Sequence, residues 1–473
     1  MVFAGTGTAG AYHAGVLRAL HEAGIRVDVV AGSGIGAVSA LFAAVDAGAR
    51  LWDANGLWLG GAGPAGLYRW RPLWRLVGWC LVGALAALAL PLALVLAASL
   101  VYLLAQVGHL VAPALGTVFS NAYDAVTRVL LAPELVYTIV PRVALVVVIG
   151  AGVTIGATLW RVRAGTRTRR RVRGGALWEA LGAPMDGGAA VAWALGGFWR
   201  FVRGATNIAQ PGPADLSRRY AELLADSLGQ PGYRELIIAV HDLDARRDLV
   251  FALLAEPHRR AFGGDANAPG AQRRHAELVD LATVGRDHVV DALGGALSVP
   301  VVTEPHALAF SPESAWRGET HRVADRPGTV SRLLEEALWA GATQVVLVGA
   351  TAELPGPHAL GPRRLDPRAR LGEYLASAET VAARDAAAAH AQRFAGLYEI
   401  RPAYNPLGPF DLAGGYDERS DRPFTLRELM GRGYEDAYRQ FIEPVVGASG
   451  EGVGAPPVQS AADDLDLRPA RDR

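Results

Sequence analysis

A sharp turn near the N-terminus has the form in which a hydrolase presents its nucleophile. The stretch VVAGSGIGAVSA, from Val29 to Ala40, reads as a strand that turns directly into a helix. A serine on such a turn is exposed at the end of the strand and can attack an acyl carbon. The serine here, Ser33, lies one place away from the position that the turn would expose. The pattern therefore favours acyl-transfer chemistry, but its serine is not at the position of the nucleophile.

A glycine-rich turn, GTGTAG, precedes this stretch and follows a short apolar strand. Gly5, Gly7 and Gly10 fit the GxGxxG pattern, in which the backbone approaches a pyrophosphate at a helix N-terminus. The acidic residue expected about 20 positions later in a dinucleotide site is absent, and a second glycine turn follows instead. Backbone N–H groups at a helix N-terminus also serve as an oxyanion hole. Two glycine turns on successive strands therefore favour acyl transfer over NAD binding.

These turns connect short strands and helices that alternate along the chain. Such alternation predicts an α/β fold with a mainly parallel central sheet and helices on both faces. The expected elements are strands over Val2–Ala4 and Val27–Ala31, helices over Ala11–Ala23 and Ala37–Ala47, and later strands over Glu235–Val240 and Gln344–Val348.

Two long uncharged runs interrupt this alternation, from Leu76 to Ala105 and from Val143 to Trp160. A bilayer-spanning helix needs about 20 residues, with a lower limit of about 17. Arginines flank both outer ends, so we expect a transmembrane helical hairpin with both ends in the cytoplasm. The segment between the runs, Gln106 to Arg142, is expected to be an outer loop with an interfacial helix, or to contain further weak spans. The alternative is that both runs are core helices of a large soluble protein.

The composition excludes several classes of function. The chain has 46 Lys and Arg against 46 Asp and Glu, and all its basic residues are arginine. This balance argues against a nucleic-acid-binding protein, which needs a concentrated basic surface. The one cysteine, Cys80, lies in an apolar run, which excludes a disulfide framework and a CxxC metal site. We expect no cofactor and no metal. No signal peptide is recognisable, so the N-terminal domain is expected to stay in the cytoplasm.

The N-terminal sequence AGTGTAGAYHAGVLRALHEAGIRVDVVAGSGIG resembles the opening of the patatin-like phospholipases. His13 and the segment from Gly15 to Leu17 match the family's helix, and the spacing to the elbow agrees without a gap. The resemblance implies a three-layer patatin-like fold, interrupted here by the transmembrane hairpin. It also implies an acyl hydrolase in which a serine attacks the ester and an aspartate acts as base. The implied oxyanion loop comprises Gly5, Thr6, Gly7 and Gly10.

Aligned with this family, the elbow begins at Gly32 and ends at Gly36, and Gly34 occupies the nucleophile's position. Glycine has no nucleophilic atom, so covalent catalysis at this position is impossible. Ser33 is the neighbour that could substitute, although the elbow pattern would then require glycines at Ala31 and Ile35. A simpler interpretation is that the Ser33 hydroxyl bonds its own turn.

The family's catalytic aspartate aligns with Asp325, in the stretch HRVADRPGTV. The glycines that usually follow it are replaced by Arg326 and Pro327, so both catalytic signatures are altered. A second D-G-G begins at Asp186, but no strand precedes it, and we interpret it as a turn. Four other polar residues are expected to be structural: Ser39, His13, His241 and Asp244.

The resemblance and the uncharged runs together divide the chain. Residues 1–68 and 174–447 are expected to form the two parts of the patatin-like domain, residues 69–173 the transmembrane insertion, and residues 448–473 a disordered tail.

Three functions remain open from the sequence. The first is a membrane-anchored, catalytically degenerate patatin-like protein of lipid metabolism, which binds lipid or a protein partner without turning it over. The second is an active lipid acyl hydrolase that uses Ser33 and Asp325, or a water activated by Asp325. The third assigns the function to the hairpin, for example in oligomerisation. The expected partners are membrane lipids or acyl esters, with a protein partner or a second copy binding through the hairpin.

Overall fold

The computed structural model describes most of the chain, and contacts divide it into two units. One unit comprises residues 1–68 and 186–473, and the other comprises residues 69–185. The predicted tail, 448–473, and the arginine-rich segment, 161–175, lie outside the described residues. The residues described are 1–60, 63–131, parts of 142–160, 182–204, 208–256, 258–262, 276–283, 285–312, 316–352 and 366–447.

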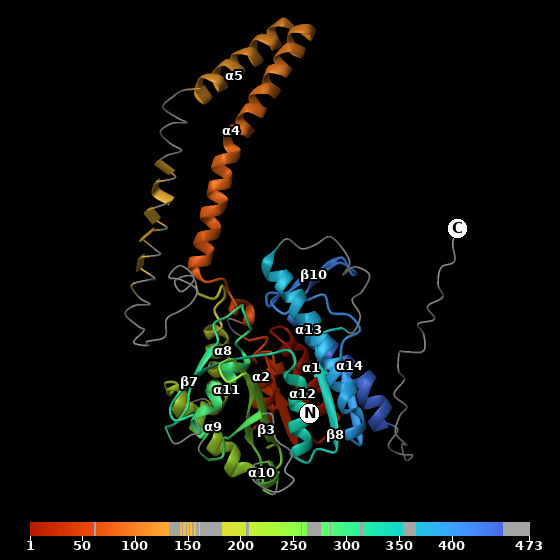
Figure 1. The fold of residues 1–473 in the computed structure, drawn as a ribbon. Coiled ribbons are helices and arrows are strands. Elements are labelled where there is room, and N and C mark those ends of the chain that lie inside the picture. The colour runs from red at the N-terminus through yellow and green to blue at the C-terminus, as the bar shows by residue number, and fades with distance from the viewer. Residues whose placement is uncertain are drawn as a thin grey trace, which may run out of the picture. The chain divides into compact units, whose positions relative to one another are not determined.

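A mainly parallel sheet forms the centre of the first unit (Figure 1). Its strand order is β5-β4-β3-β2-β1-β8-β9, and the β6–β7 hairpin joins it through β7, which pairs with β3. The pairs β1–β2, β2–β3, β1–β8, β8–β9 and β4–β5 are parallel, whereas β3–β4 is antiparallel. The α/β fold predicted from the alternating elements is therefore present. The strands of this sheet are β1 Val2–Ala4, β2 Val29–Gly32, β3 Glu235–Asp242, β4 Arg247–Leu253, β5 Ala276–Asp280, β6 His306–Ala309, β7 Thr320–Ala324, β8 Gln344–Gly349 and β9 Gly396–Ile400.

Helices cover both faces of this sheet. On one face, Val2, Ala31 and Ile237 pack against Leu333 and Leu334 of α12 in a buried apolar cluster. On the other face, the Phe3 ring lies 5.2 Å from the His13 ring of α1, centroid to centroid. Because both faces are covered, the central strands are apolar on both sides.

The first unit contains further helices and a small hairpin. The helices are α1 Ala9–Glu22, α2 Gly36–Ala44, α3 Ala49–Trp52, α8 Gly188–Arg203, α9 Pro213–Ser227, α10 His258–Phe262, α11 Val289–Ala296, α12 Thr329–Trp339, α13 Pro367–His390, α14 Leu426–Ala437 and a π-helical segment Tyr438–Val446, with short 3₁₀ turns at Pro64–Gly66, Arg286–His288 and Ala391–Arg393. The hairpin strands are β10 Gly415–Asp417 and β11 Arg422–Phe424.

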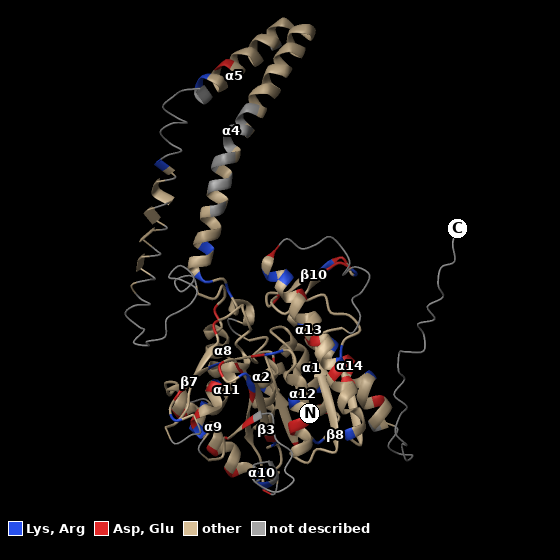
Figure 2. Cartoon of the chain, viewed as in Figure 1, with Lys and Arg blue, Asp and Glu red and all other residues tan. Residues whose placement is uncertain are grey.

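Among its described residues, the second unit includes the helices α4 and α5, which have few charged side chains (Figure 2). Helix α4, Pro72–Val111, includes the predicted span Leu76–Ala105 and continues beyond it. Helix α5, Pro113–Leu131, packs against the end of α4, where the Tyr102 and Tyr123 rings lie 5.4 Å apart. Helix α5 lies within the segment Gln106 to Arg142, for which the sequence predicted an outer loop with an interfacial helix or further weak spans.

None of the helices in the described part of the chain is both long and apolar enough to cross a membrane. The predicted spans Leu76–Ala105 and Val143–Trp160 therefore have no support from this part of the chain, and many residues of the second lie outside the description.

The sheet places the two glycine turns side by side. Strands β1 and β2 pair in parallel with Phe3 opposite Gly32, so both turns leave the carboxyl edge of the sheet. Strand β8 ends on the other side of β1, with Gly349 opposite Ala4. In sheets of this kind, ligands bind beyond the carboxyl ends of the strands.

Candidate functional site

The elbow between β2 and α2 is tight and buried. Gly34 has a left-handed backbone (φ +57°), which a glycine adopts without strain. The turn is fixed by the Ser33 N–H, which donates to the Phe3 carbonyl at 3.1 Å, and by the Gly36 N–H, which donates to the Ser33 carbonyl at 3.0 Å. The chain therefore retains the strand-turn-helix geometry of a nucleophile elbow while lacking a hydroxyl at Gly34.

The space around Gly34 indicates what a side chain there would meet. A Cβ added to Gly34 would lie 2.9 Å from Oδ2 of Asp325 and would overlap the carbonyl oxygen of Gly5. The structure thus places Asp325 beside the elbow, although 291 residues separate the two positions in the numbering. It also places a carbonyl group where a nucleophile's side chain would begin.

The glycine loop between β1 and α1 presents a hydrogen-bond acceptor, a backbone carbonyl, to the elbow. The Gly5 carbonyl accepts a hydrogen bond from the Ile35 N–H at 2.9 Å. On the loop's other side, the Thr8 N–H donates to the Pro409 carbonyl at 3.0 Å. A Cβ on Gly7 would overlap that same carbonyl, so Pro409 covers the loop closely. Gly10 continues into α1, where its N–H donates to the Gly7 carbonyl at 3.3 Å.

Asp325 follows β7 and is nearly buried, with an exposed fraction of 8%. Its N–H donates to the Ser298 carbonyl at 2.8 Å, which fixes the start of the loop. Burial raises the pKa of Asp325 to about 7, opposed by hydrogen bonds from the backbone N–H groups of Arg326 and Gly34. Its Oδ1 atom is buried and has no hydrogen-bond partner among the described residues. Asp325 can therefore hold or release a proton near neutral pH.

A second carboxyl group, Glu379, lies beside the glycine loop and was not among the residues predicted from the sequence. It is on α13, and its Oε1 accepts a hydrogen bond from the Thr6 hydroxyl at 2.5 Å. A Cβ added to Gly5 would lie 3.8 Å from its Oε2. Burial raises the pKa of Glu379 to about 8, and the negative charge of Asp325 adds to this increase. The two carboxyl groups thus influence each other across Gly5.

A cavity of about 40 Å³ joins these groups at the carboxyl ends of β1, β8 and β9. Its lining includes Ser33, Asp325 and Glu379, together with Arg326, Glu399 and Arg401. Ser33 is 4% exposed and shares the cavity with Asp325, but the hydrogen bonds that act on the pKa of Asp325 come from backbone groups.

The residues expected to be structural lie in fixed hydrogen-bond networks. His13 Nε2 lies 3.2 Å from the Ala4 carbonyl and Nδ1 lies 3.3 Å from the Ser39 hydroxyl. Burial lowers the pKa of His13 to about 3, so the ring is neutral. Asp186 begins α8, where its Oδ1 accepts the Gly188 N–H at 2.9 Å.

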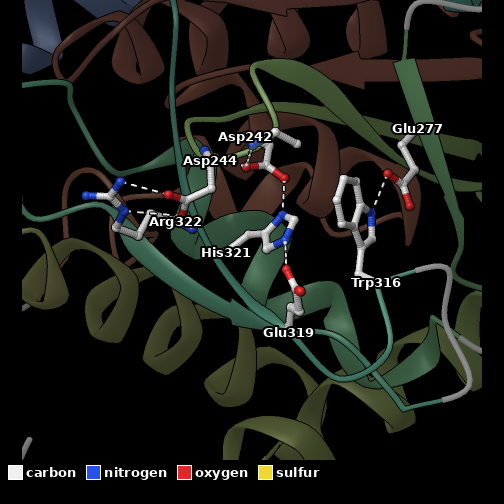
Figure 3. Close-up of polar contacts among 8 residues, drawn as sticks. Asp242, Asp244, Glu277, Trp316, Glu319, His321 and Arg322 are labelled. Atoms are coloured by element: carbon white, nitrogen blue, oxygen red, sulfur yellow. Dashed lines mark hydrogen bonds and ion pairs between the residues drawn. The ribbon is translucent and has the colours of Figure 1, made fainter. Parts of the chain in front are cut away.

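The β3–β4 turn holds a separate polar cluster (Figure 3). Asp242 is buried and its Oδ2 lies 2.6 Å from Nδ1 of His321, while Glu319 approaches the other ring nitrogen at 3.5 Å. Asp244 pairs with Arg322 at 2.8 Å. Burial disfavours the charged His321 ring, but the bond to Asp242 raises its pKa overall. His241 pairs elsewhere, with Asp248 at 2.8 Å. The side chains of His241 and Asp244 are thus both engaged in hydrogen bonds.

The groups that this site offers for chemistry are its carboxyl groups. Within the described part of the chain, no three His, Cys, Asp or Glu side chains are grouped so that they could hold a metal ion. Two carboxyl groups with raised pKa values can exchange protons or bind a cation.

The fold and the elbow define an α/β protein with the layout of a hydrolase. Residues 1–95 match the family model described as patatin-like phospholipase. The N-terminal part of the chain is therefore patatin-like, and the resemblance inferred from the sequence is confirmed. The matched segment includes the glycine loop and the elbow and ends before Asp325.

Two further comparisons give less information about this chain than the family model does. The crystal structure of VipD from Legionella pneumophila is similar at 10% identity and a TM-score of 0.30, covering 93% of this chain and 66% of that one. This likeness is too weak to define the site. A search of curated proteins finds no match.

Proposed function

We propose that this chain is a patatin-like protein of lipid metabolism that binds a lipid without hydrolysing it. The observation that carries the proposal is Gly34, which stands at the nucleophile's position in an otherwise preserved elbow. Without a hydroxyl at this position, the acyl-enzyme intermediate of the family has no atom on which to form.

The glycine loop supports the same proposal. An oxyanion hole requires N–H groups directed at the developing negative charge. Here the Gly5 carbonyl is directed at the elbow, and the Thr8 N–H is already bonded to Pro409. A carbonyl oxygen beside the reacting centre would repel an oxyanion.

A second candidate function is an acyl hydrolase that uses Ser33 and Asp325. The observation in its favour is that both residues line one cavity and that Asp325 has a pKa of about 7, suitable for a general base. Ser33 precedes the exposed position of the elbow, its N–H donates to the Phe3 carbonyl, and no hydrogen bond joins its hydroxyl to Asp325 among the described residues. We therefore favour the non-hydrolytic protein.

The test is covalent labelling combined with an esterase assay. We expect the full-length chain to react with no fluorophosphonate and to hydrolyse p-nitrophenyl esters and phospholipids no faster than a detergent blank. Labelling of the unmodified chain that disappears in Ser33→Ala would instead establish the hydrolase. In that case the loss of hydrolysis should be large, on the order of 10³-fold or more, as for other nucleophile deletions.

We also propose that the chain attaches to the cytoplasmic face of a membrane. The support is the sequence itself, since the run from Leu76 to Ala105 carries no charge and arginines precede it. Attachment would hold the cavity near its lipid ligand.

A further inference from the structure

The cavity between Asp325 and Glu379 holds two carboxyl groups whose oxygen atoms have few hydrogen-bond donors among the described residues. The Asp325 side chain is 8% exposed and lines the cavity, and backbone N–H groups of Arg326 and Gly34 donate to it. Its Oδ1 atom nevertheless is buried with no partner among the described residues, and the donor that the structure shows for Glu379 is a neutral hydroxyl, Thr6. A buried carboxylate oxygen without a donor is costly, so this arrangement favours a ligand that donates hydrogen bonds.

The basic side chains that line the cavity are already paired. Arg326 forms an ion pair with Asp248 at 2.9 Å, and Arg401 pairs with Glu399 at 3.4 Å. The chain has no lysine. Among the described residues, no other basic side chain lines the cavity, so a positive charge that bridges the two carboxyl groups would have to be supplied by a ligand.

We propose that this cavity binds a primary ammonium group, carried by an aminolipid headgroup or by a free amine. An ammonium group has three N–H donors, which can be shared by Asp325, Glu379 and the Ser33 hydroxyl. The cavity of about 40 Å³ has room for roughly three water molecules, and thus for a small cationic group.

The lining argues against two other cations. A quaternary ammonium group has no N–H donor and is usually held by aromatic rings, and the cavity's lining includes no aromatic residue. A divalent metal ion prefers six or more oxygen ligands, or at least three protein ligands, and the described residues include no such group. The inference rests on the proposed lipid-binding function and adds the class of headgroup.

The binding test uses methylammonium chloride and the full-length chain in a mild detergent, measured by calorimetry at pH 8. We expect saturable binding that is weakened about tenfold or more in Glu379→Gln and in Asp325→Asn, because each removes a charge-assisted hydrogen bond. The matched control is Glu373→Gln, which removes an exposed carboxylate from the same helix and should leave binding unchanged. Tetramethylammonium should not bind. Absent methylammonium binding, or equal binding to the wild type and Glu379→Gln, would overturn the proposal.

The pH dependence gives a second readout that needs no variant. Both carboxyl groups must lose their protons to accept the ammonium donors, and their pKa values are about 7 and about 8. An alkylammonium group stays charged up to a pH of about 10. Binding should therefore tighten between pH 6 and pH 8 and release protons. The other charged groups of the lining are Arg326, Arg401 and Glu399. Binding that weakens over this range would also contradict the ammonium site.

Vesicles distinguish the two sources of the ammonium group. Stronger binding to phosphatidylethanolamine vesicles than to phosphatidylcholine vesicles, abolished by Glu379→Gln, would identify the aminolipid. Binding of methylammonium without this vesicle preference would identify a free amine. Hydrolysis of the vesicle lipid by the wild type would refute the proposed function and leave the ammonium site intact.

Discussion

Gly34 combines two constraints that can be separated by mutation. Its left-handed backbone disfavours any side chain, and a Cβ would also overlap the Gly5 carbonyl. Gly24 has a similar backbone (φ +68°) but open space around its Cβ position. We predict that Gly34→Ala lowers the free energy of unfolding by clearly more than Gly24→Ala, which should cost about 1–2 kcal/mol for the backbone alone. Chemical denaturation of the two variants provides the comparison.

The same contact has a consequence for restoring catalysis. Gly34→Ser would rebuild the family's elbow sequence, and its hydroxyl would start near Oδ2 of Asp325. The Gly5 carbonyl would first have to rotate away, so we expect little or no recovered hydrolysis. Equal destabilisation by Gly34→Ala and Gly24→Ala would mean that the loop moves freely and that this barrier does not exist.

The raised pKa values of Asp325 and Glu379 predict how stability depends on pH. Both groups keep a proton up to pH values of about 7 and about 8 in the folded chain, whereas the unfolded chain releases it near pH 4. The folded state binds more protons in this window, so its stability should fall as the pH rises from about 5 to about 8. The double variant Asp325→Asn, Glu379→Gln should show a smaller fall. Thermal unfolding at several pH values measures the difference, and parallel curves would refute it.

The sequence contained part of the site. The elbow and the glycine loop were recognisable because their glycines follow apolar strands at fixed spacing, and Asp325 could be aligned because a helix-to-strand unit follows it. Glu379 gave no such signal, because it lies within the alanine-rich helix α13. The composition of this helix does not distinguish the face that contacts the site. Pro409 was missed because its contact with the glycine loop depends on tertiary packing.

At the scale of elements, Asp242 fixes the turn between β3 and β4. Its Oδ1 accepts the N–H groups of Asp244 and Ala245 at 2.8 and 2.9 Å, and its Oδ2 holds His321 of β7 (Figure 3). Because Asp242 is fully buried, Asp242→Ala leaves these donors and the His321 ring without an acceptor. We predict a loss of about 3–5 kcal/mol in the free energy of unfolding.

Arg322 of β7, which pairs with Asp244 of the same turn, is the matched control. Its ion pair with Asp244 is on the surface, where the Arg322 side chain is 62% exposed. Arg322→Ala should therefore cost less than about 1 kcal/mol. Similar losses for Arg322→Ala and Asp242→Ala would show that burial does not decide the strength of this cluster.

The alternation of apolar strands and helices predicted the parallel core of the sheet well. Strand β1 has the predicted bounds, and β3 and β8 extend the predicted strands by one or two residues. The segment between the two uncharged runs, Gln106 to Arg142, was expected to be an outer loop with an interfacial helix or to contain further weak spans. Helix α5 lies within this segment and packs on α4, with the Tyr102 and Tyr123 rings 5.4 Å apart.

At the scale of the whole molecule, the first and last residues of the second unit lie close together. Trp70 and Met185 form an isolated β-bridge, and the Arg71 N–H donates to the Pro184 carbonyl at 2.9 Å. A short linker can therefore join Tyr68 to Asp186. We predict that a chain with residues 69–185 replaced by a glycine-serine linker unfolds cooperatively, because the described residues of the excised segment contribute no strand to the sheet. Circular dichroism and thermal unfolding would measure this, and an aggregated or non-cooperative product would contradict it.

The same deletion tests membrane attachment. We expect the full-length chain to stay in the membrane pellet after an alkaline carbonate wash and the deletion variant to be released. Release of both chains would refute attachment through residues 69–185, whereas retention of both would assign it to another part of the chain.

The sheet's pairing pattern has a consequence for synthesis on the ribosome. Gly32 at the end of β2 pairs with Ile238 of β3. About 200 residues must therefore be translated after β2 before β3 is available to pair with it. At about 5–20 residues per second this takes roughly 10 to 40 seconds. During that interval the nascent β1 and β2 can pair with each other but lack their outer neighbours β8 and β3, and strands with such open edges readily pair with other chains. The N-terminal segment should therefore depend on a nascent-chain chaperone more strongly than a protein whose central strands are consecutive.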